Sequence, residues 1–333
     1  MNNNKFRAML VTETENKEFK REITTRQIKD LPEGDVIINV KYSSLNYKDA
    51  LSATGNKGVT RNYPHTPGID AAGIVVQSNN DSLKTGDEVL VTGYALGMST
   101  SGGYGEYIRV PAQWVVKLPS NLSLRESMIY GTAGFTAALS VYKLVNSGVK
   151  PSDGDILVTG STGGVGSMAI SILSKIGYNV TAATGKTSEK EMLLGIGANN
   201  IIDRNEIDDT SGKALLKNRW AGVIDTVGGN ILATAIKSTN YGGSVTCCGN
   251  VADHEFKTSV YPFILKGITL LGIDSVQCPM DIRLQIWNKL SLDWKITDLY
   301  TNVNEVSLDG LNKEINTIIK GNHKGRTIVN LDL

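Results

Sequence analysis

The segment that most constrains the fold runs from residue 155 to residue 180. It begins with the apolar run ILV at residues 156–158, which is typical of a buried parallel strand. A glycine-rich turn, GSTGGVG at residues 160–166, follows, and apolar residues then recur at helical spacing up to Ile176. This order predicts a βαβ unit whose turn brings backbone N–H groups close to a dinucleotide diphosphate. A tight turn without a ligand is the alternative, and the flanking strands and helix argue against it.

Length and charge limit the class of protein. A chain of 333 residues exceeds one typical core, so two domains are expected. The net charge of +1 gives no general attraction to nucleic acid or to a membrane surface, and neither is expected as a partner. No apolar run has the length of a membrane span, and the polar N-terminus lacks a signal-peptide core. The cysteines Cys247, Cys248 and Cys278 form no disulfide framework, so we expect reduced thiols in a cytoplasmic protein.

The first third of the chain carries β patterns. Short apolar segments separated by glycine turns predict a small barrel over residues 1–125. A capping box at Ser123 and Glu126 then starts a helix, and the pattern changes to alternating strands and helices. The expected strands of the barrel lie at residues 6–12, 35–42, 69–76, 88–92 and 106–110.

Alternating β and α patterns predict a doubly wound parallel sheet over residues 126–294. Residues 295–333 return to β signals, and a final strand there would complete the first domain. The fold class is therefore α/β, with a barrel domain of residues 1–125 and 295–333 and an inserted nucleotide-binding domain. The expected strands of the inserted domain lie at residues 155–159, 179–183, 200–202, 221–226, 243–247 and 269–272.

The residues that end the second strand of the βαβ unit select the cofactor. An acidic residue there would bind the ribose 2′-hydroxyl of NADH, but none occurs before Glu189. Lys186 offers a cation instead, and the hydroxyls of Thr184 and Ser188 can donate to phosphate oxygens. Arg204, near the end of the third strand, adds a second cation. The sequence therefore favours NADPH, and a solvated loop lysine at position 186 is the alternative.

A catalytic metal is not expected. His65, His254 and His323 are far apart and lack ligand spacing, so we interpret each as a polar surface or loop residue. With three cysteines in the chain, the ligands of a catalytic zinc site are missing. The turn GSTGG also differs from a nucleophile elbow. Catalysis would then depend on the hydride chemistry of a cofactor, with the protein orienting groups and supplying a proton.

Three motifs carry a family resemblance. The segments PGIDAAG at residues 67–73 and GTAGFTA at residues 131–137, with the glycine turn, resemble the zinc-independent branch of the medium-chain dehydrogenase/reductase superfamily. That resemblance implies a GroES-like catalytic domain and a Rossmann nucleotide-binding domain. In zinc-dependent members a histidine and a glutamate follow the first glycine of PGID, whereas this chain has Ile69 and Asp70. The replacement agrees with the expected absence of a metal.

Longer segments resemble bacterial NADPH-dependent acryloyl-CoA reductases of the quinone oxidoreductase-like branch. They include SSLNYKDAL at residues 43–51, IDTVGG at residues 224–229 and PFILKG at residues 262–267, and the resemblance covers nearly the whole chain. It implies a homodimer that pairs through residues 269–275. It also implies NADPH contacts from Tyr47, Ser161, Thr162, Gly163, Gly164, Val165, Thr184, Gly185, Lys186, Arg204, Asn250, Ile264 and Ser275.

The expected reaction is hydride transfer from NADPH to the β-carbon of an α,β-unsaturated thioester such as acryloyl-CoA. Negative charge would develop on the thioester oxygen, and Asn46 and Tyr47 are the candidate catalytic donors toward it. Either the Tyr47 hydroxyl or a water would protonate the α-carbon. Alternatively, Tyr47 only packs on the nicotinamide and orients it. Arg61 and Lys57 could meet the CoA phosphates, although a solvated loop also accounts for both.

Two other functions remain compatible with the sequence. The first is a quinone or general enone reductase with the same cofactor and a different acceptor. The second is a sensor that binds NADPH without turnover. Such a sensor would not need residues on the nicotinamide side, and the presence of Asn46 and Tyr47 argues against it.

Overall fold

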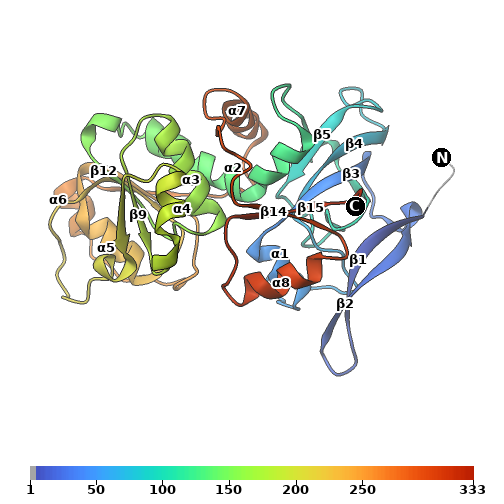
Figure 1. The fold of residues 1–333 in the computed structure, drawn as a ribbon, viewed down its shortest axis with the longest axis horizontal. Helices are drawn as coiled ribbons and strands as arrows, with labels where there is room; N and C mark the ends of the chain where they lie inside the picture. Colours follow the sequence, from blue (N-terminus) through green and yellow to red (C-terminus); the bar gives the residue numbers. More distant parts are fainter. Residues whose placement is uncertain (1–4) are drawn as a thin grey trace. The chain divides into compact units, whose positions relative to one another are not determined.

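The computed structural model describes residues 5–333, and these form two compact units (Figure 1). Residues 1–4, which the sequence assigned to the barrel domain, lie outside the described residues. Unit 1 is assembled from three separate stretches of the chain, so it is discontinuous. Unit 1 comprises the residues up to Thr132, Val276–Ser291 and Leu299–Leu333, and unit 2 comprises Ala133–Ser275 and Leu292–Asp298.

Three segments fall in a different unit from the one that the sequence suggested: residues 126–132 and 276–291 belong to unit 1, and residues 295–298 belong to unit 2. Residues 276–291 were placed in the nucleotide-binding domain, but helix α7 (Met280–Ser291) belongs to unit 1. The fully buried Arg283 of α7 donates from Nη1 to the carbonyl of Thr92 at 2.8 Å. Its guanidinium also lies 4.6 Å from the ring centroid of Tyr94, which stacks on Trp114. A buried cation thus joins α7 to the barrel strands, and helical periodicity alone does not reveal that partner.

Unit 1 contains a seven-stranded sheet and a hairpin of β1 with β2. The strand order in the sheet is β14-β15-β3-β4-β5-β7, with β6 also paired to β3. β14 and β15 pair in parallel, and the other pairs are antiparallel. Its strands are β1 (Lys5–Glu13), β2 (Phe19–Gln27), β3 (Val36–Leu45), β4 (Asp70–Ser78), β5 (Glu88–Thr92), β6 (Tyr107–Val110), β7 (Val116–Lys117), β14 (Val303–Ser307) and β15 (Arg326–Asn330). Its helices are α1 (Tyr47–Ala53), α7 (Met280–Ser291), α8 (Leu311–Ile319), η1 (Ile28–Asp30) and η2 (Ala112–Trp114).

The sequence analysis did not predict strand β2. Its sequence FKREITTRQ is polar at most positions, and its side chains are half-buried or exposed. The strand forms because β1 offers a partner: the two pair antiparallel from Lys5 opposite Gln27 to Glu13 opposite Phe19. Pairing to a neighbouring strand, rather than alternation of apolar side chains, therefore defines this element.

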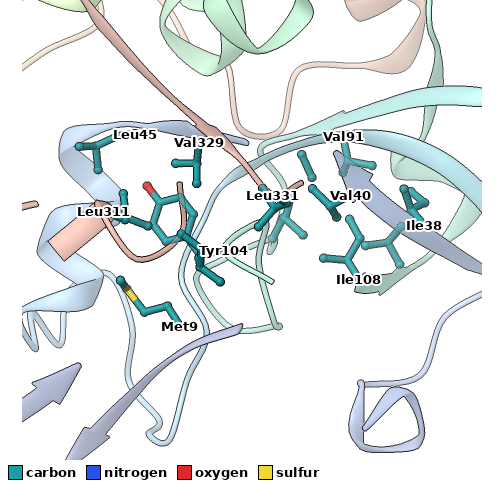
Figure 2. Packing of buried hydrophobic residues seen from close by; sticks show 14 of the residues in the cluster. Met9, Ile38, Val40, Leu45, Val91, Tyr104, Ile108, Leu311, Val329 and Leu331 are labelled. Atoms are coloured by element: carbon teal, nitrogen blue, oxygen red, sulfur yellow. The ribbon is translucent and has the colours of Figure 1, made fainter. Parts of the chain in front are cut away.

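The core of unit 1 lies between elements that are distant in sequence. Figure 2 shows Met9 of β1, Ile38 and Val40 of β3, Leu311 of α8 and Val329 of β15 packed together. All five are at most 1 % exposed. Because β15 supplies part of this core, residues of the C-terminal segment belong to unit 1.

Unit 2 is a doubly wound parallel sheet. The strand order β10-β9-β8-β11-β12-β13 is the 3-2-1-4-5-6 order of the Rossmann fold, which confirms the predicted fold class. The order reverses between β8 and β11, where such sheets bind ligands. Its strands are β8 (Ile156–Val158), β9 (Val180–Thr184), β10 (Asn200–Asp203), β11 (Trp220–Asp225), β12 (Thr239–Cys247) and β13 (Thr269–Gly272). Its helices are α3 (Gly164–Lys175), α4 (Lys190–Gly195), α5 (Gly229–Ser238), α6 (Tyr261–Lys266), η3 (Pro151–Asp153), η4 (Thr187–Glu189) and η5 (Arg204–Ile207).

Helix α2 (Leu124–Asn146) carries the chain from unit 1 into unit 2. It begins with the predicted capping box, in which Glu126 accepts from the Ser123 backbone at 2.8 Å and donates its own N–H to the Ser123 hydroxyl at 3.1 Å. The helix is interrupted at Gly131, whose φ is 50°. The two helices expected from the sequence are therefore the two halves of α2. Among residues 5–333, no helix combines the length and apolar character needed to span a membrane.

Candidate functional site

The glycine turn joins β8 to α3 and requires glycine at two positions. Gly160 has a φ of 59°, and a side chain there would also collide with the Thr226 hydroxyl. A Cβ on Gly166 would lie 2.5 Å from the carbonyl oxygen of Gly160. The turn is thus closed on itself and pressed against the end of β11, so its backbone can approach a ligand closely.

The open part of the turn presents backbone N–H groups. The first bond of α3 runs from the Ser167 N–H to the Gly163 carbonyl at 2.9 Å. Helix geometry therefore leaves the N–H groups of Gly164, Val165 and Gly166 without intrahelical acceptors. Together with the positive end of the helix dipole, they can bind a diphosphate. The structure thus brings the predicted backbone contacts of Gly163, Gly164 and Val165 into one place.

Two hydroxyl-bearing residues of the turn point inward. Ser161 is fully buried, and its hydroxyl donates to the Val158 carbonyl at 2.8 Å. Thr162 is 8 % exposed. The Ser161 side chain therefore stabilises the turn, and its backbone N–H donates to the Ala183 carbonyl at 3.4 Å.

Asp225, at the end of β11, holds the base of the turn. Its carboxylate accepts from the Thr159 hydroxyl and from the Gly228 N–H, both at 2.8 Å. The Thr226 hydroxyl in turn donates to the Thr159 carbonyl at 2.9 Å. Burial raises the pKa of Asp225 to about 6. The sequence reading used IDTVGG only as a family motif and missed this role, although an acid that directly follows an apolar strand run is a detectable signal.

The end of β9 brings the two predicted cations together. A Cβ on Gly185 would lie 2.8 Å from Nε of Arg204, so the guanidinium of Arg204 covers Gly185, next to Lys186. The Lys186 N–H donates to the buried Thr184 hydroxyl oxygen at 3.0 Å, which fixes the turn. In register opposite Thr184 lies Asp203, whose carboxylate accepts from the Asn205 N–H at 2.8 Å and caps η5. The acid nearest to this strand end therefore already has a structural partner.

Ser188 differs from its predicted use. Its hydroxyl donates to the Glu189 carboxylate at 2.8 Å, so it is engaged within the protein. Glu189 is 6 % exposed. The first acid after β9 thus lies buried beside a hydroxyl, which agrees with the sequence argument that no carboxylate serves the ribose at this strand end.

Two of the three remaining predicted contacts in unit 2 lie at the carboxyl ends of its strands. Asn250 is exposed just beyond the carboxyl end of β12, and Ser275 is half-buried beyond the carboxyl end of β13. Both therefore lie at the sheet edge that carries the glycine turn. Ile264 is different: it lies on α6, which leads to the start of β13, and its side chain is 67 % exposed. The strand order therefore does not place Ile264 with Asn250 and Ser275 at the carboxyl edge of the sheet.

Asn46 and Tyr47 mark the start of α1 in unit 1. Tyr47 is the first helical residue, and its side chain is 52 % exposed. Asn46 is 9 % exposed, and its amide nitrogen lies 2.8 Å from Oδ2 of Asp70 and 3.2 Å from Oδ2 of Asp49. Both amide hydrogens thus point to buried carboxylates. The predicted use of Asn46 as a donor to an enolate finds no support in this geometry, and Tyr47 remains as the accessible candidate.

A buried charged group surrounds Asn46. Asp49, Asp70 and Arg326 are at most 3 % exposed. Burial raises the pKa of Asp49 to about 7, and the charge of Asp70 adds to the rise. Burial lowers the pKa of Arg326, while the charges of Asp70 and Asp49 oppose that shift. Of these residues, the sequence reading noted only Asp70, as the replacement of a metal ligand.

Histidines and cysteines behave partly as expected. His65 is buried rather than a surface residue, and burial lowers its pKa. His254 is exposed, and His323 contacts the Thr327 hydroxyl at 2.9 Å. Within residues 5–333, no group of three His, Cys, Asp or Glu side chains is arranged to hold a metal ion. The three cysteines are free thiols, and burial raises the pKa of Cys248 to about 12.

The predicted loop cation Lys57 has partners within unit 1. Its ammonium pairs with the Glu13 carboxylate at 2.5 Å and lies 4.7 Å from the ring centroid of Tyr63. Arg61 is exposed. The geometry therefore favours a structural role for Lys57 over a contact with CoA phosphates.

Comparison with known proteins agrees with both units. The family profile "Alcohol dehydrogenase GroES-like domain" matches residues 32–120, and "Zinc-binding dehydrogenase" matches residues 164–290. Bacillus subtilis YhfP, named as a quinone oxidoreductase, is 48 % identical over 310 residues, which cover 93 % of this chain and 94 % of the relative. Acrylyl-CoA reductase AcuI of Ruegeria pomeroyi is 40 % identical over 325 residues, which cover 97 % and 98 %. The chain belongs to the medium-chain dehydrogenase/reductase family.

Solved structures of this family resemble the whole chain. The YhdH oxidoreductase of Salmonella enterica, determined with NADP, has a TM-score of 0.95 and 40 % identity, covering 98 % of this chain and 99 % of the other. Bacillus subtilis YhfP, determined with NAD, has a TM-score of 0.96 and 45 % identity, covering 99 % and 100 %. Relatives of similar fold have therefore been determined with either form of the cofactor.

Proposed function

We propose that this protein is an NADPH-dependent reductase that transfers hydride to the β-carbon of an α,β-unsaturated acyl-CoA of the acryloyl type. The assignment of NADPH as the cofactor rests on the end of β9. There Lys186 and Arg204 lie next to Gly185, and no carboxylate is placed to bind the ribose 2′-hydroxyl. Arg204 and Lys186 can both pair with a 2′-phosphate. The relatives named as acrylyl-CoA reductases support the acceptor.

The residues of unit 2 fit a dinucleotide. A Cβ on Gly160 or Gly166 would collide with Thr226 or with the Gly160 carbonyl, so glycine keeps the turn tight, and the start of α3 offers N–H groups to the diphosphate. Asn250 and Ser275, at the carboxyl edge of the sheet, are the proposed contacts toward the nicotinamide end. The Ile264 contact stays a proposal that rests on the family resemblance.

The chemistry divides between cofactor and protein. Bound NADPH would supply the hydride, and the protein must then stabilise charge on the thioester oxygen and deliver a proton. Tyr47 is the proposed donor, because this residue is half-exposed whereas the Asn46 amide is directed inward. Replacing Tyr47 by Phe should lower kcat strongly if the hydroxyl donates the proton, and should change it little if the ring only orients the nicotinamide.

A quinone or enone acceptor is the second candidate. The 48 % identical YhfP is named as a quinone oxidoreductase, and its structure contains NAD. A substrate panel decides: acryloyl-CoA, crotonyl-CoA, benzoquinone and an aliphatic enone, each with NADPH and with NADH. We expect the highest kcat/KM for acryloyl-CoA with NADPH. Equal or higher efficiency with benzoquinone would overturn the acyl-CoA assignment and leave the cofactor assignment intact.

We also propose a homodimer that pairs along β13. This strand ends the sheet order of unit 2, and its Leu270 and Leu271 are half-buried. On the preceding α6, Ile264 and Leu265 are 67 % and 56 % exposed. An apolar sheet edge is a liability unless another strand covers it. Light scattering should give a dimer for the wild type and a monomer for Leu271→Arg, and a monomeric wild type would contradict the proposal.

A further inference from the structure

Asp70 connects two distant segments of unit 1 through one carboxylate. It is the first residue of β4 and is fully buried. Oδ2 accepts from the Asn46 amide at 2.8 Å, from the Thr132 N–H at 2.8 Å and from the Ser44 hydroxyl. Oδ1 accepts from the Thr132 hydroxyl at 2.6 Å. Because both oxygens are bound by donors from two directions, the carboxylate cannot shift without breaking one set of bonds.

The first segment is the start of α1. The backbone N–H of Asn46 donates to Oδ2 of Asp49 at 2.9 Å, and the side-chain Oδ1 of Asn46 accepts from Arg326 at 3.3 Å. With the bond to Asp70, Asn46 is held through its backbone and through both ends of its side chain. Tyr47 follows directly as the first residue of α1, and it is half-exposed. The direction in which Tyr47 projects therefore depends on how Asn46 is fixed.

The second segment is the break in α2. A Cβ on Gly131 would lie 2.5 Å from the Ser44 hydroxyl and 2.6 Å from Oδ2 of Asp70. Gly131 and Thr132 thus both contact the carboxylate of Asp70. Thr132 is the last residue of unit 1 before the chain enters unit 2. The carboxylate of Asp70 consequently also fixes the point at which the chain leaves unit 1.

We propose that Asp70 is a positioning residue for the reaction: it sets the placement of Tyr47 by holding Asn46, and it anchors Asn46 to Thr132. The inference rests on the proposed function in so far as Tyr47 acts there. The carboxylate accepts at both oxygens, from Asn46, Ser44 and Thr132, and the NH₂ of an amide would replace at least one of these accepting positions by a donor. This gives position 70 a task other than metal binding.

Kinetics of matched variants test the positioning role. Thr132→Val removes a hydroxyl that donates to Asp70, whereas Thr54→Val removes a hydroxyl that donates to the Ala50 and Leu51 carbonyls at the opposite end of α1. We expect Thr132→Val to lower kcat by about threefold to tenfold with KM for NADPH within about twofold, and Asp70→Asn to lower it further. Thr54→Val should leave kcat within about twofold of the wild type. Equal effects of the two threonine variants would overturn the proposal.

A double-mutant cycle separates positioning from general damage. In a Tyr47→Ala background, Thr132→Val should change kcat by less than about twofold, because the residue that it places is gone. The same fold loss in both backgrounds would contradict the inference. The acceptor is whichever compound the wild type reduces, so failure of acryloyl-CoA as a substrate affects the proposed function and leaves this cycle measurable.

Hydrogen exchange tests the same inference without any substrate. In Asp70→Asn and in Thr132→Val, amides at residues 46–50 and at residue 132 should exchange at least about tenfold faster than in Thr54→Val. Amides of β8 and β11 in unit 2 serve as an internal reference and should be unchanged. Unaltered exchange at the start of α1 in both variants would overturn the proposal, whatever the kinetics show.

Discussion

The two units build their candidate sites in opposite ways. In unit 2, the glycine turn is contiguous and the strand end that selects the cofactor follows it along the same chain. In unit 1, the residues around Asn46 come from β3, β4, α2 and β15, and the bond from Arg326 to Asn46 spans 280 positions. The first site combines backbone groups of the glycine turn with the cations Lys186 and Arg204, whereas the second uses buried side chains. The glycine turn therefore depends on backbone geometry, but the group around Asn46 depends on each buried side chain.

The strongest test of this contrast removes the only positive charge of the buried group around Asn46. Arg326→Met deletes the bonds to Ile129 and Ser44 and leaves Asp70 buried without a countercharge. We expect a loss of about 3–5 kcal/mol in the free energy of unfolding. As control, Arg125→Met breaks a half-exposed pair with Glu305 and should cost about 1 kcal/mol or less. Urea denaturation measures both, and equal losses would contradict the difference.

A pH series compares the buried acids of the two units. A carboxyl with a raised pKa holds its proton in the folded protein and releases it on unfolding, so stability falls as pH rises between the two pKa values. For Asp49 this window runs from 3.8 to about 7, and for Asp225 from 3.8 to about 6. Relative to the wild type, Asp49→Asn and Asp225→Asn should each gain about 1–3 kcal/mol across its window. A wild-type curve parallel to both variants would refute the argument.

A glycine pair tests the backbone character of the unit 2 site. Gly166→Ala places a Cβ 2.5 Å from the Gly160 carbonyl oxygen and forces the turn to move. We expect NADPH affinity to fall by about tenfold or more, while unit 1 keeps its fold. Gly195→Ala, on α4, meets no atom within 4 Å and should leave affinity within about twofold. Fluorescence titration compares the two, and similar affinities would show that the turn does not contact the cofactor.

The smallest effects are expected from the hydroxyls near the cofactor. Ser161 donates to Val158, and Ser188 donates to Glu189. Ser161→Ala and Ser188→Ala should therefore change NADPH affinity by less than about twofold. A larger loss in either variant would indicate that its hydroxyl turns to a phosphate on binding and adds a side-chain contact to those proposed for Lys186 and Arg204.

What the sequence could predict follows the same division. The strands of unit 2 and the capping box at Ser123 were visible because apolar periodicity and turn residues are local signals. The cations Lys186 and Arg204 were identified from their places at strand ends, and the sheet register brings them together. Strand β2 was missed because its polar sequence carries no alternation.

The group around Asn46 could not be assembled in this way. Asp49 and Arg326 are charged residues, and the local sequence does not show that both become buried. Only the pairing of β3 with β4 and β15 brings Ser44, Asp70 and Arg326 to one point. The inward contacts of the Asn46 amide could not be foreseen for the same reason, since Asp70 reaches it through strand pairing rather than through sequence spacing.

The most direct test of the central claim is a titration of the wild type and of the variant Lys186→Ala/Arg204→Ala with NADPH and with NADH. The structure places both cations at the end of β9. The wild type should bind NADPH at least about tenfold more tightly than NADH, and the double variant should lose most of this preference while its NADH affinity stays within about twofold. Equal affinity of the wild type for both cofactors, or binding of neither, would contradict the account.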